Sequence, residues 1–322
     1  MVGEKIVDFL INKNGGLKLN LAFIPYCFKM WDSMSSVYES ANKRGLGTAV
    51  FPIPYFSLKD GKIDEWHHDY LSFTNVVDED DLYDFNDFYK LSNEIDYVII
   101  HNAYDDGNTL TTIHPFFYSD MLKAFGLKII FIPYGIPYGG VSYDLMRLQK
   151  GALNADYIFV NCKEEREGFI ESWKKVGVDM TDRCLAFGSP KTDGLFKEYK
   201  MPPEWQIKIL RPVTMICTSI LPFMKDPERK LKEYRWHIEN ELSKGNMVIF
   251  RPHPLMDETV KQRCPELWND WIGLLEFADE NAIDDYGHEL TESMYFSQKL
   301  ISDVSSVIEI WKLTGKQLEI MD

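Results

Sequence analysis

The sequence of 322 residues lacks the features by which several large classes of protein are recognised. It contains no CxxC pair, so neither a zinc site nor a disulfide framework is indicated. No HExxH, GxSxG, Walker A or GxGxxG pattern occurs, which argues against zinc proteases, serine hydrolases, P-loop NTPases and dinucleotide-binding proteins. The five cysteines are widely spaced, at Cys27, Cys162, Cys184, Cys217 and Cys264.

Long apolar runs and positive charge are also scarce. No run is long enough to span a membrane, and the opening MVGEKIVDFLINKNGG is too polar for a secretory signal, so we expect a cytoplasmic protein. The chain has 35 Lys and Arg against 50 Asp and Glu, a net charge of −15, without a dense basic run. Because nucleic-acid binding normally needs a basic face, this function is not expected. The same charge argues against broad attachment to anionic lipid.

The chain is long and apolar enough for two domains. Hydrophobic residues make up 45% of it, and its length exceeds the usual size of one domain. Short apolar runs alternate with helical patterns, and several runs are continuous, as in strands covered on both faces. We therefore predict an α/β fold with parallel sheets. The elements expected in the first half are strands 19–24, 48–53, 97–101, 128–132, 157–161 and 184–187 and helices 4–12, 33–44, 143–153 and 163–176.

A segment with two adjacent prolines, residues 198–211, interrupts this alternation. We predict that it links a first domain, 1–200, to a second domain, 208–322. The second domain would have about 110 residues, which is small for a complete nucleotide-binding domain, so either it is naturally short or a final strand and helix are missing. The elements expected in it are strands 213–217, 246–250, 299–301 and 316–321 and helices 227–242 and 304–312.

Two polar loops follow predicted strands of the second domain, where open parallel sheets bind ligands. In ISDVSSVIEIWK, Ser305 and Ser306 offer hydroxyl and backbone N–H groups to an anion, or else Ser302 or Asp303 merely caps a helix. In FRPHP, two prolines fix the backbone around His253, and Arg251 has the shape to bind a phosphate; the alternative is a plain surface turn.

Weaker signals occur at other predicted strand ends. Thr218 and Ser219 directly follow strand 213–217 and offer two more hydroxyls. In GSPKTDGLF, Gly188 permits a close backbone approach, either to a ligand or within a tight turn, and Asp193 is a candidate helix cap.

The first half has one strongly polar loop, HNAYDDGNTLTTIHPFFYS. It begins with His101 and Asn102 after strand 97–101 and ends beyond His114. So polar a loop at a strand end suits an acceptor that bears hydroxyl groups, although Asp105 and its neighbour equally suit a solvated turn.

Three segments, in this order, resemble the CDP-glycerol glycerophosphotransferase family, whose members make teichoic-acid-like polymers of the wall and capsule. They are GSPKTDGLF, FRPHP and ISDVSSVIEIW, and the likeness is clear over about residues 157–313. The resemblance implies the GT-B fold, with two Rossmann-like parallel-sheet domains facing each other across a cleft and the donor in the C-terminal half. It implies a donor site made of Arg251, His253, Asp303, Ser305, Ser306 and Glu309, to which the strand-end hydroxyls Thr218 and Ser219 are added.

The resemblance also implies a catalytic arrangement, with one departure. His253 would hydrogen-bond or protonate the departing phosphate. Members of the family carry a His-Gly-Thr-Pro motif whose His is the candidate base, but here the stretch reads Tyr134-Gly135-Ile136-Pro137. We therefore expect the base to be His101, Asp105 or His114. The acceptor-side residues are expected to be Asn102, Tyr104, Tyr134 and Gly188.

The function implied is transfer of a glycerol-phosphate-type group from a CDP-linked donor to a hydroxyl of a glycan or lipid-linked acceptor. A lipid-linked acceptor would bring the protein to the inner face of the plasma membrane, although no amphipathic anchor is obvious in the sequence. No cofactor or divalent metal is implied. The alternatives are a glycosyltransferase or epimerase that uses a UDP-sugar, and a nucleotide-binding homologue without catalysis.

Overall fold

The computed structural model describes residues 1–137, 144–206, 210–285 and 288–321. The chain divides into two compact units, Met1–Gly194 and Leu195–Asp322, where the sequence suggested domains 1–200 and 208–322. In the described part of the chain, no helix is of a length and apolarity that would cross a membrane.

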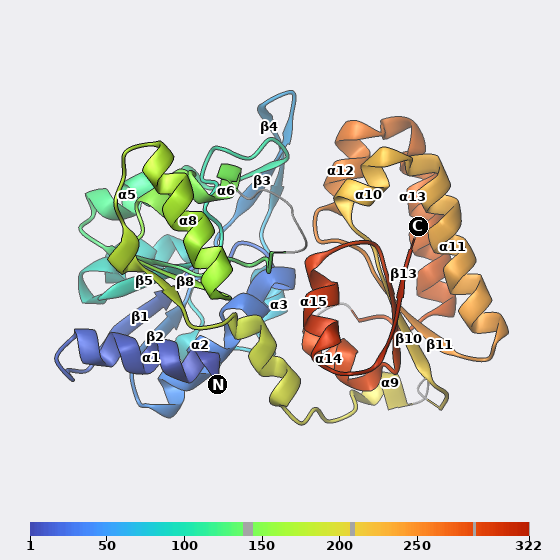
Figure 1. Cartoon of the computed structure of the whole chain (residues 1–322), viewed down its shortest axis with the longest axis horizontal. Coiled ribbons are helices and arrows are strands. Elements are labelled where there is room, and N and C mark those ends of the chain that lie inside the picture. The colour runs from blue at the N-terminus through green and yellow to red at the C-terminus, as the bar shows by residue number, and fades with distance from the viewer. Residues whose placement is uncertain (138–143, 207–209, 286–287, 322) are drawn as a thin grey trace. The chain divides into compact units, whose positions relative to one another are not determined.

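The first unit is built on a six-stranded parallel sheet with the order β2-β1-β5-β7-β8-β9 (Figure 1). All six strands predicted for the first half are present and belong to this sheet. The strand order reverses at β1, whose neighbours are β2 on one side and β5 on the other. The strands are β1 (Asn20–Phe23), β2 (Gly47–Val50), β5 (Tyr97–Ile100), β7 (Lys128–Phe131), β8 (Tyr157–Val160) and β9 (Cys184–Ala186).

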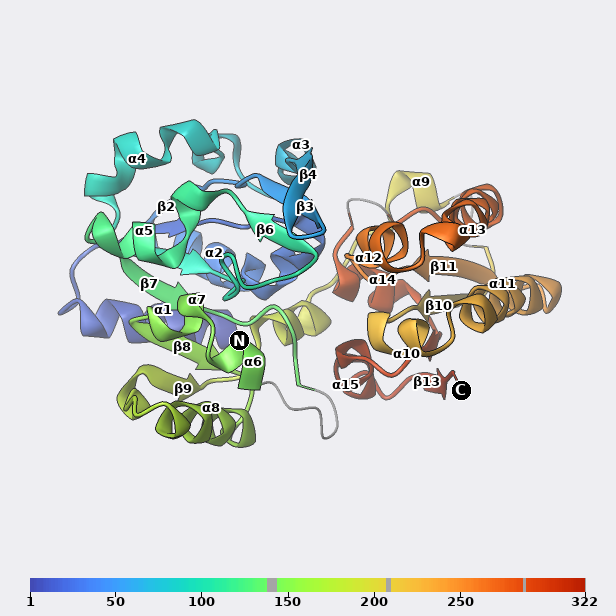
Figure 2. The same cartoon turned by 90° about the horizontal axis from the view of Figure 1, so that it is seen from above.

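Both faces of this sheet are covered by helices, which explains why several of its strands are continuously apolar. Alternate strand residues point to opposite faces, so Ile100 packs in one core and Ile99 in the other. Helices α4, α5, α7 and α8 contribute to the first core, and α1, α2 and α3 to the second (Figure 2). The helices are α1 (Val2–Lys13), α2 (Ser35–Lys43), α3 (Tyr70–Phe73), α4 (Phe88–Leu91), α5 (Ser119–Ala124), α6 (Asp144–Arg147), α7 (Lys150–Leu153) and α8 (Lys163–Lys175).

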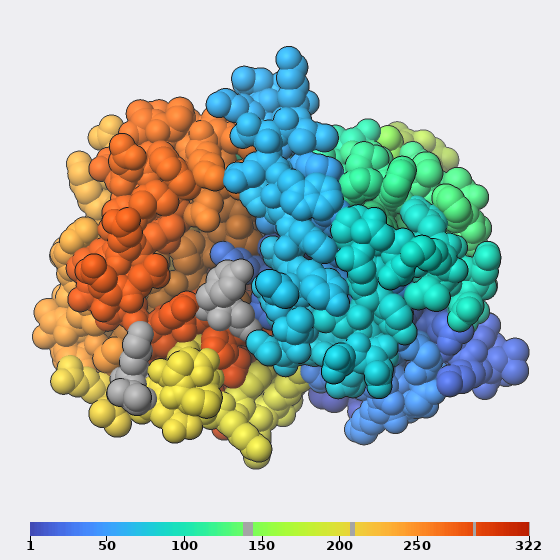
Figure 3. Space-filling view, turned by 180° about the vertical axis from the view of Figure 1, so that it is seen from behind, coloured from blue at the N-terminus to red at the C-terminus, as the bar shows by residue number. Residues whose placement is uncertain are grey.

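Two features of the first unit differ from the prediction. The helix expected over 143–153 consists of two short helices, α6 and α7, and residue 143 lies outside the described residues. An antiparallel sheet was not expected: β3 (Tyr55–Lys59), β4 (Lys62–His67) and β6 (Thr111–Ile113) pair in the order β4-β3-β6. Its hairpin turns at Asp60 and Gly61, whose φ angles of 51° and 72° suit an Asp-Gly turn. Figure 3 shows the segment that contains this hairpin projecting at the surface of the first unit.

The second unit has a four-stranded parallel sheet with the order β11-β10-β12-β13. One face forms a core with helices α10 to α13, while α14 contacts β10 and α15 contacts β12. The four predicted strands and two predicted helices are present, but α10, α12, α13 and α14 were not predicted. The elements are β10 (Val213–Cys217), β11 (Met247–Arg251), β12 (Lys299–Ser302), β13 (Gln317–Ile320), α10 (Ile220–Lys225), α11 (Pro227–Ser243), α12 (Met256–Arg263), α13 (Trp268–Asn281), α14 (Leu290–Phe296) and α15 (Ser306–Lys312).

The segment predicted as a linker has structure of its own. It carries a short helix, α9 (Pro203–Gln206), and Trp205 is 1% exposed. The Trp205 indole N–H donates to the carbonyl of Asp284 at 2.8 Å, which fastens α9 to the second unit. This contact explains why the unit boundary precedes the pair of prolines.

Candidate functional site

Three loops of the second unit begin at one edge of its sheet, which we call the carboxyl edge; it comprises Thr218–Ser219, Arg251–Leu255 and Ser302–Ser306. Strand β10 lies between β11 and β12, and Cys217, its last residue, pairs with both Arg251 and Ser302. The loops that carry the two main sequence motifs are thus neighbours of the same strand. The structure brings these motifs together as the sequence predicted, while their binding of a donor remains a prediction.

The loop after β10 is joined to the loop that carries His253. The backbone N–H of His253 donates to the Thr218 hydroxyl at 3.2 Å, and Thr218 is buried. The backbone N–H of Leu255 donates to Nδ1 of His253 at 3.1 Å. Because Nδ1 is an acceptor, the neutral imidazole carries its proton on Nε2. Nε2 of His253 is therefore a hydrogen-bond donor in the neutral side chain.

Asp303 lies in the interior beneath the carboxyl edge and is 0% exposed. Its Oδ1 accepts from the Lys230 ammonium at 2.8 Å. Its Oδ2 accepts from the Tyr234 hydroxyl at 2.5 Å and from the backbone N–H of Ser219 at 2.9 Å. Burial, followed by the charge of Asp303, raises the pKa of Tyr234, so this hydroxyl is a donor. Both carboxylate oxygens of Asp303 are thus occupied within the protein.

Ser305 and Ser306 lie at the start of the helix that follows β12, as predicted from the sequence. Ser305 is the N-cap of α15, and Ser306 is its first residue. The hydroxyls of Ser305 and Ser302 are 3.4 Å apart, and both Ser305 and Ser306 are partly exposed. Glu309, expected at a donor ribose, forms an exposed ion pair with Lys312 at 2.9 Å.

Arg251 is held by groups that precede or belong to α14. One guanidinium nitrogen donates to Asp285 Oδ2 at 2.6 Å and to the Ser293 hydroxyl at 3.4 Å. The other donates to the carbonyl of His288 at 3.1 Å. The Arg251 side chain is only 15% exposed, so a phosphate that is to bind its guanidinium competes with these partners.

In the first unit, His101 is an interior residue at the end of β5. It is 1% exposed, and burial lowers its pKa to about 3, so the ring is neutral. Its Nε2 accepts from the backbone N–H of Tyr26 at 3.3 Å, and Nδ1 lies 3.3 Å from the Met30 carbonyl and from the Ser33 hydroxyl. Both ring nitrogens therefore have partners within the unit.

The other two expected bases also have structural partners. Asp105 Oδ2 accepts from the backbone N–H and the hydroxyl of Ser119, at 2.9 and 2.6 Å, and thereby holds the start of α5. Burial raises the pKa of Asp105 to about 6. Nδ1 of His114 accepts from the backbone N–H of Phe116 at 3.3 Å, and burial lowers the pKa of His114.

The residues expected on the acceptor side lie in two loops of the first unit and at the end of β9. The Asn102 side chain accepts from the backbone N–H of Tyr104 at 3.1 Å. The carbonyl of Tyr134 accepts from the Lys191 ammonium at 2.8 Å, and Lys191 pairs with buried Asp32 at 3.2 Å. Neither Lys191 nor Asp32 was singled out from the sequence.

Gly188 and Asp193 lie against the first helix. Gly188 has φ 108°, and a Cβ there would lie 2.8 Å from the Val2 side chain. Asp193 accepts from the backbone N–H groups of Val2 and Gly3, at 2.8 and 2.7 Å. Asp193 does cap a helix, as its position in GSPKTDGLF suggested. The helix is α1, which lies about 190 residues earlier in the sequence.

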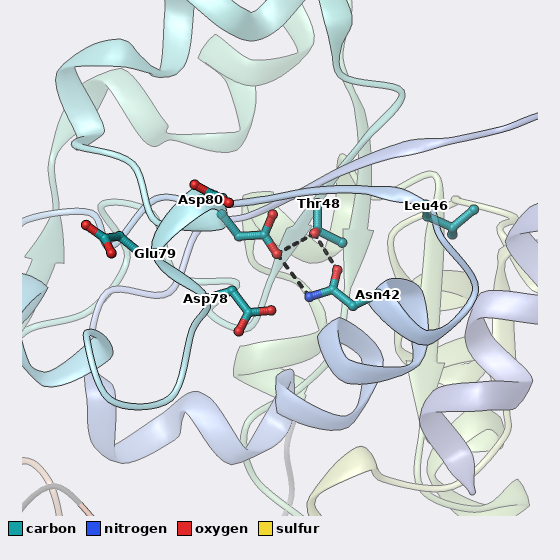
Figure 4. Close-up of a pocket in the computed structure, with 7 residues that line it drawn as sticks. Asn42, Leu46, Thr48, Asp78, Glu79 and Asp80 are labelled. Carbon is teal, nitrogen blue, oxygen red and sulfur yellow. Dashed lines mark hydrogen bonds between the residues drawn. The ribbon is translucent and has the colours of Figure 1, made fainter.

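The first unit has a pocket of about 520 Å³, lined by Asn42, Leu46, Thr48 and Asp78–Asp81. Figure 4 shows these lining residues. The carboxylate of Asp81 accepts from Thr48 at 2.8 Å and from Asn42 at 2.9 Å. This acidic pocket lies beside the start of β2 rather than beside the loops that follow the strands.

Within either unit, the described residues bring together no three His, Cys, Asp or Glu ligand atoms suited to a metal ion.

The two units, each with a helix-covered parallel sheet, define the Rossmann-like GT-B class, as predicted. No protein-family model and no curated protein sequence matches the chain. Among solved structures, it is similar to the UDP-GlcNAc 2-epimerase of Methanocaldococcus jannaschii, at 10% identity over 94% of this chain and 83% of that one, with a TM-score of 0.56. It is also similar to the wall teichoic acid polymerase TagF, at 15% identity, 98% and 72% coverage and a TM-score of 0.54. S. aureus MnaA, solved with UDP, gives 12% identity, 94% and 78% coverage and 0.53. Likeness at these identities shows the fold.

Proposed function

We propose that the chain is a transferase that moves a glycerol-phosphate-type group from a CDP-linked donor to a hydroxyl of a glycan or lipid-linked acceptor. The observation that carries this proposal is the meeting of the RPHP and SDVSS loops on either side of β10. The likeness to TagF, whose name describes a wall teichoic acid polymerase, supports it at the level of fold.

In the proposed reaction, the acceptor hydroxyl attacks the β-phosphorus of the donor. A P–O bond forms to the acceptor oxygen, the bond from the β-phosphorus to the bridging oxygen breaks, and CMP leaves with the electron pair. The Nε2 proton of His253 would be donated to the departing phosphate oxygen, and the hydroxyls of Ser305 and Ser306 would hold the phosphates. The proton of the acceptor passes to solvent or to a base.

At the three positions expected to supply a base, His101, Asp105 and His114 each accept a hydrogen bond from another group of the first unit. Phosphoryl transfer needs little covalent help, because its transition state is loose and catalysis relies mainly on positioning and charge neutralisation. We therefore propose that the second unit contributes most of the rate enhancement, and that the base is one of these three residues.

A nucleotide panel tests the proposal. Thermal unfolding would be followed with CDP-glycerol, CDP-ribitol, CDP-choline and UDP-GlcNAc; a ligand at 100 times its Kd stabilises by about 2.7 kcal/mol. We expect a shift with CDP-glycerol, and loss of that shift in Ser305→Ala/Ser306→Ala. Ser243→Ala, at an exposed position of the same unit, is the matched control. The absence of any shift with the CDP compounds would refute the proposal.

The second candidate is an epimerase or glycosyltransferase that uses a UDP-sugar. The likeness to the M. jannaschii UDP-GlcNAc 2-epimerase, with a TM-score of 0.56, favours it as much as TagF favours the first. Stabilisation by UDP-GlcNAc alone would select this candidate. Stabilisation by a CDP compound without release of CMP in the presence of acceptors would indicate a binding protein.

A further inference from the structure

A charged network is buried beneath the carboxyl edge of the second unit. It joins Asp303 to Lys230 and Tyr234, which lie one turn apart on α11, and to the backbone of Ser219. Lys230 is 1% exposed, Tyr234 0% and Asp303 0%. Lys230 also pairs with Glu233 at 2.9 Å, so its charge is shared between two carboxylates.

Burying these charges is costly. Removing an ion pair from water costs free energy that the attraction often does not repay, and apolar residues of similar volume frequently stabilise as well or better. A buried pair is therefore weak evidence for stability. The geometry of this pair suggests a different role, because its members come from separate elements that meet at the carboxyl edge.

Each contact of Asp303 fastens one of these elements. Lys230 and Tyr234 tie it to α11, and the N–H of Ser219 ties it to the start of α10. Its own backbone N–H donates to the carbonyl of Cys217 at 3.1 Å, which fixes it to the end of β10. Since Thr218 binds the backbone of His253, the network reaches the RPHP loop through one further hydrogen bond.

We propose that Lys230 and Tyr234 are positioning residues for the binding of a nucleotide diphosphate at the carboxyl edge. By holding Asp303, they fix the Thr218–Ser219 turn and the Ser305–Ser306 turn, and Asp303 acts through these turns because its oxygens are occupied. The inference rests on the proposed function for the identity of the ligand. The network of Asp303, Lys230 and Tyr234 holds the two turns in place whether or not a ligand is bound.

The test compares Tyr234→Phe with the wild-type protein. The variant keeps the ring and removes one hydrogen bond to a carboxylate. Titration calorimetry with CDP and UDP is expected to show a Kd raised about tenfold, since a bond to a charged group is among the stronger ones. Hydrogen exchange of the ligand-free protein is expected to quicken in peptides that cover 217–226 and 301–308.

Thr214→Val is the matched control. Thr214 lies on β10 in the same unit, is buried, and donates to Glu241 at 2.9 Å, so its replacement also removes one buried hydrogen bond to a carboxylate. It is expected to lower the Tm comparably without changing the Kd. Lys230→Met leaves Asp303 unpaired and is expected to unfold more readily, so the decision rests on Tyr234→Phe.

The outcomes are distinct. A Tyr234→Phe protein with a Kd within twofold of the wild type and unchanged exchange would overturn the inference, and so would equal weakening by Thr214→Val. If the wild type binds neither CDP nor UDP, yet Tyr234→Phe quickens exchange in the two turns alone, the positioning of the turns stands and the proposed nucleotide function falls.

Discussion

Replacing Asp193 tests how the first unit is held together. Its two carboxylate oxygens accept the backbone N–H groups of Val2 and Gly3 in the first turn of α1, and the residue is 1% exposed. Loss of a capping side chain costs about 0.5–2 kcal/mol, and a carboxylate at a partly buried helix N-terminus adds up to about 2 kcal/mol. These contributions overlap, so we expect Asp193→Ala to lower the free energy of unfolding by about 2–3 kcal/mol.

The effect is measurable in several ways. At about 2–4 °C per kcal/mol, the transition of the first unit should fall by about 4–12 °C in calorimetry. Asp193→Asn keeps one acceptor oxygen and should lose about half as much. Asp182→Ala, at an exposed position of the same unit, serves as the control and should lie within about 0.5 kcal/mol of the wild type. Hydrogen exchange should quicken first in residues 2–13. An Asp193→Ala protein as stable as the control would refute the reasoning.

Three further predictions concern the second unit. Burial lowers the pKa of His288, but hydrogen bonds to Glu292 and Glu204 outweigh it and raise the pKa overall. The contribution of His288 to the free energy of unfolding is therefore full below about pH 6.5 and is lost as pH rises through the folded pKa. Urea unfolding should accordingly separate His288→Gln from the wild type most at low pH. Asp285→Asn should lower the Kd for CDP about fivefold in calorimetry, because an ion pair to Arg251 worth about 1 kcal/mol no longer competes; an unchanged Kd would indicate that the guanidinium does not bind the ligand. His253→Ala should slow CMP release at least about a hundredfold at unchanged CDP affinity, and near-full turnover would remove His253 from the mechanism.

The strands were predictable from the sequence because a buried parallel strand needs a continuous apolar run. Central strands such as β5 (YVII) and β7 (KIIF) meet this condition, whereas the outer strands β2 (GTAV) and β13 (QLEI) are more polar and less buried. The hairpin β3–β4 was missed although Asp60-Gly61 is a strong turn signal. Strand β4, KIDEWH, is mostly exposed and carries charged residues, so its sequence has no apolar run. The helices between β11 and β12 were missed because their charged residues weaken the apolar periodicity.

The candidate site was predictable in its loops but not in its contacts. Residues directly after strands could be located, since the strands were found. The partners of those residues come from far along the chain: Asp285 binds Arg251 from 34 positions away, and Lys230 binds Asp303 from 73. Spacing in a single sequence carries no information on such pairs, because it is the packing of α11 and α14 that brings them together.

The capping of α1 by the Asp193 carboxylate has a consequence for the order in which the first unit forms during synthesis. Helix α1 leaves the ribosome before the six strands of this unit, but the carboxylate that caps it follows about 190 residues later, after all of those strands. Until then, the N–H groups of Val2 and Gly3 remain with water, and the helix can dock only loosely. Helix α1 is made before the six strands of its unit yet is fixed in place after them, so a nascent chain stalled before Asp193 should expose α1 to proteases.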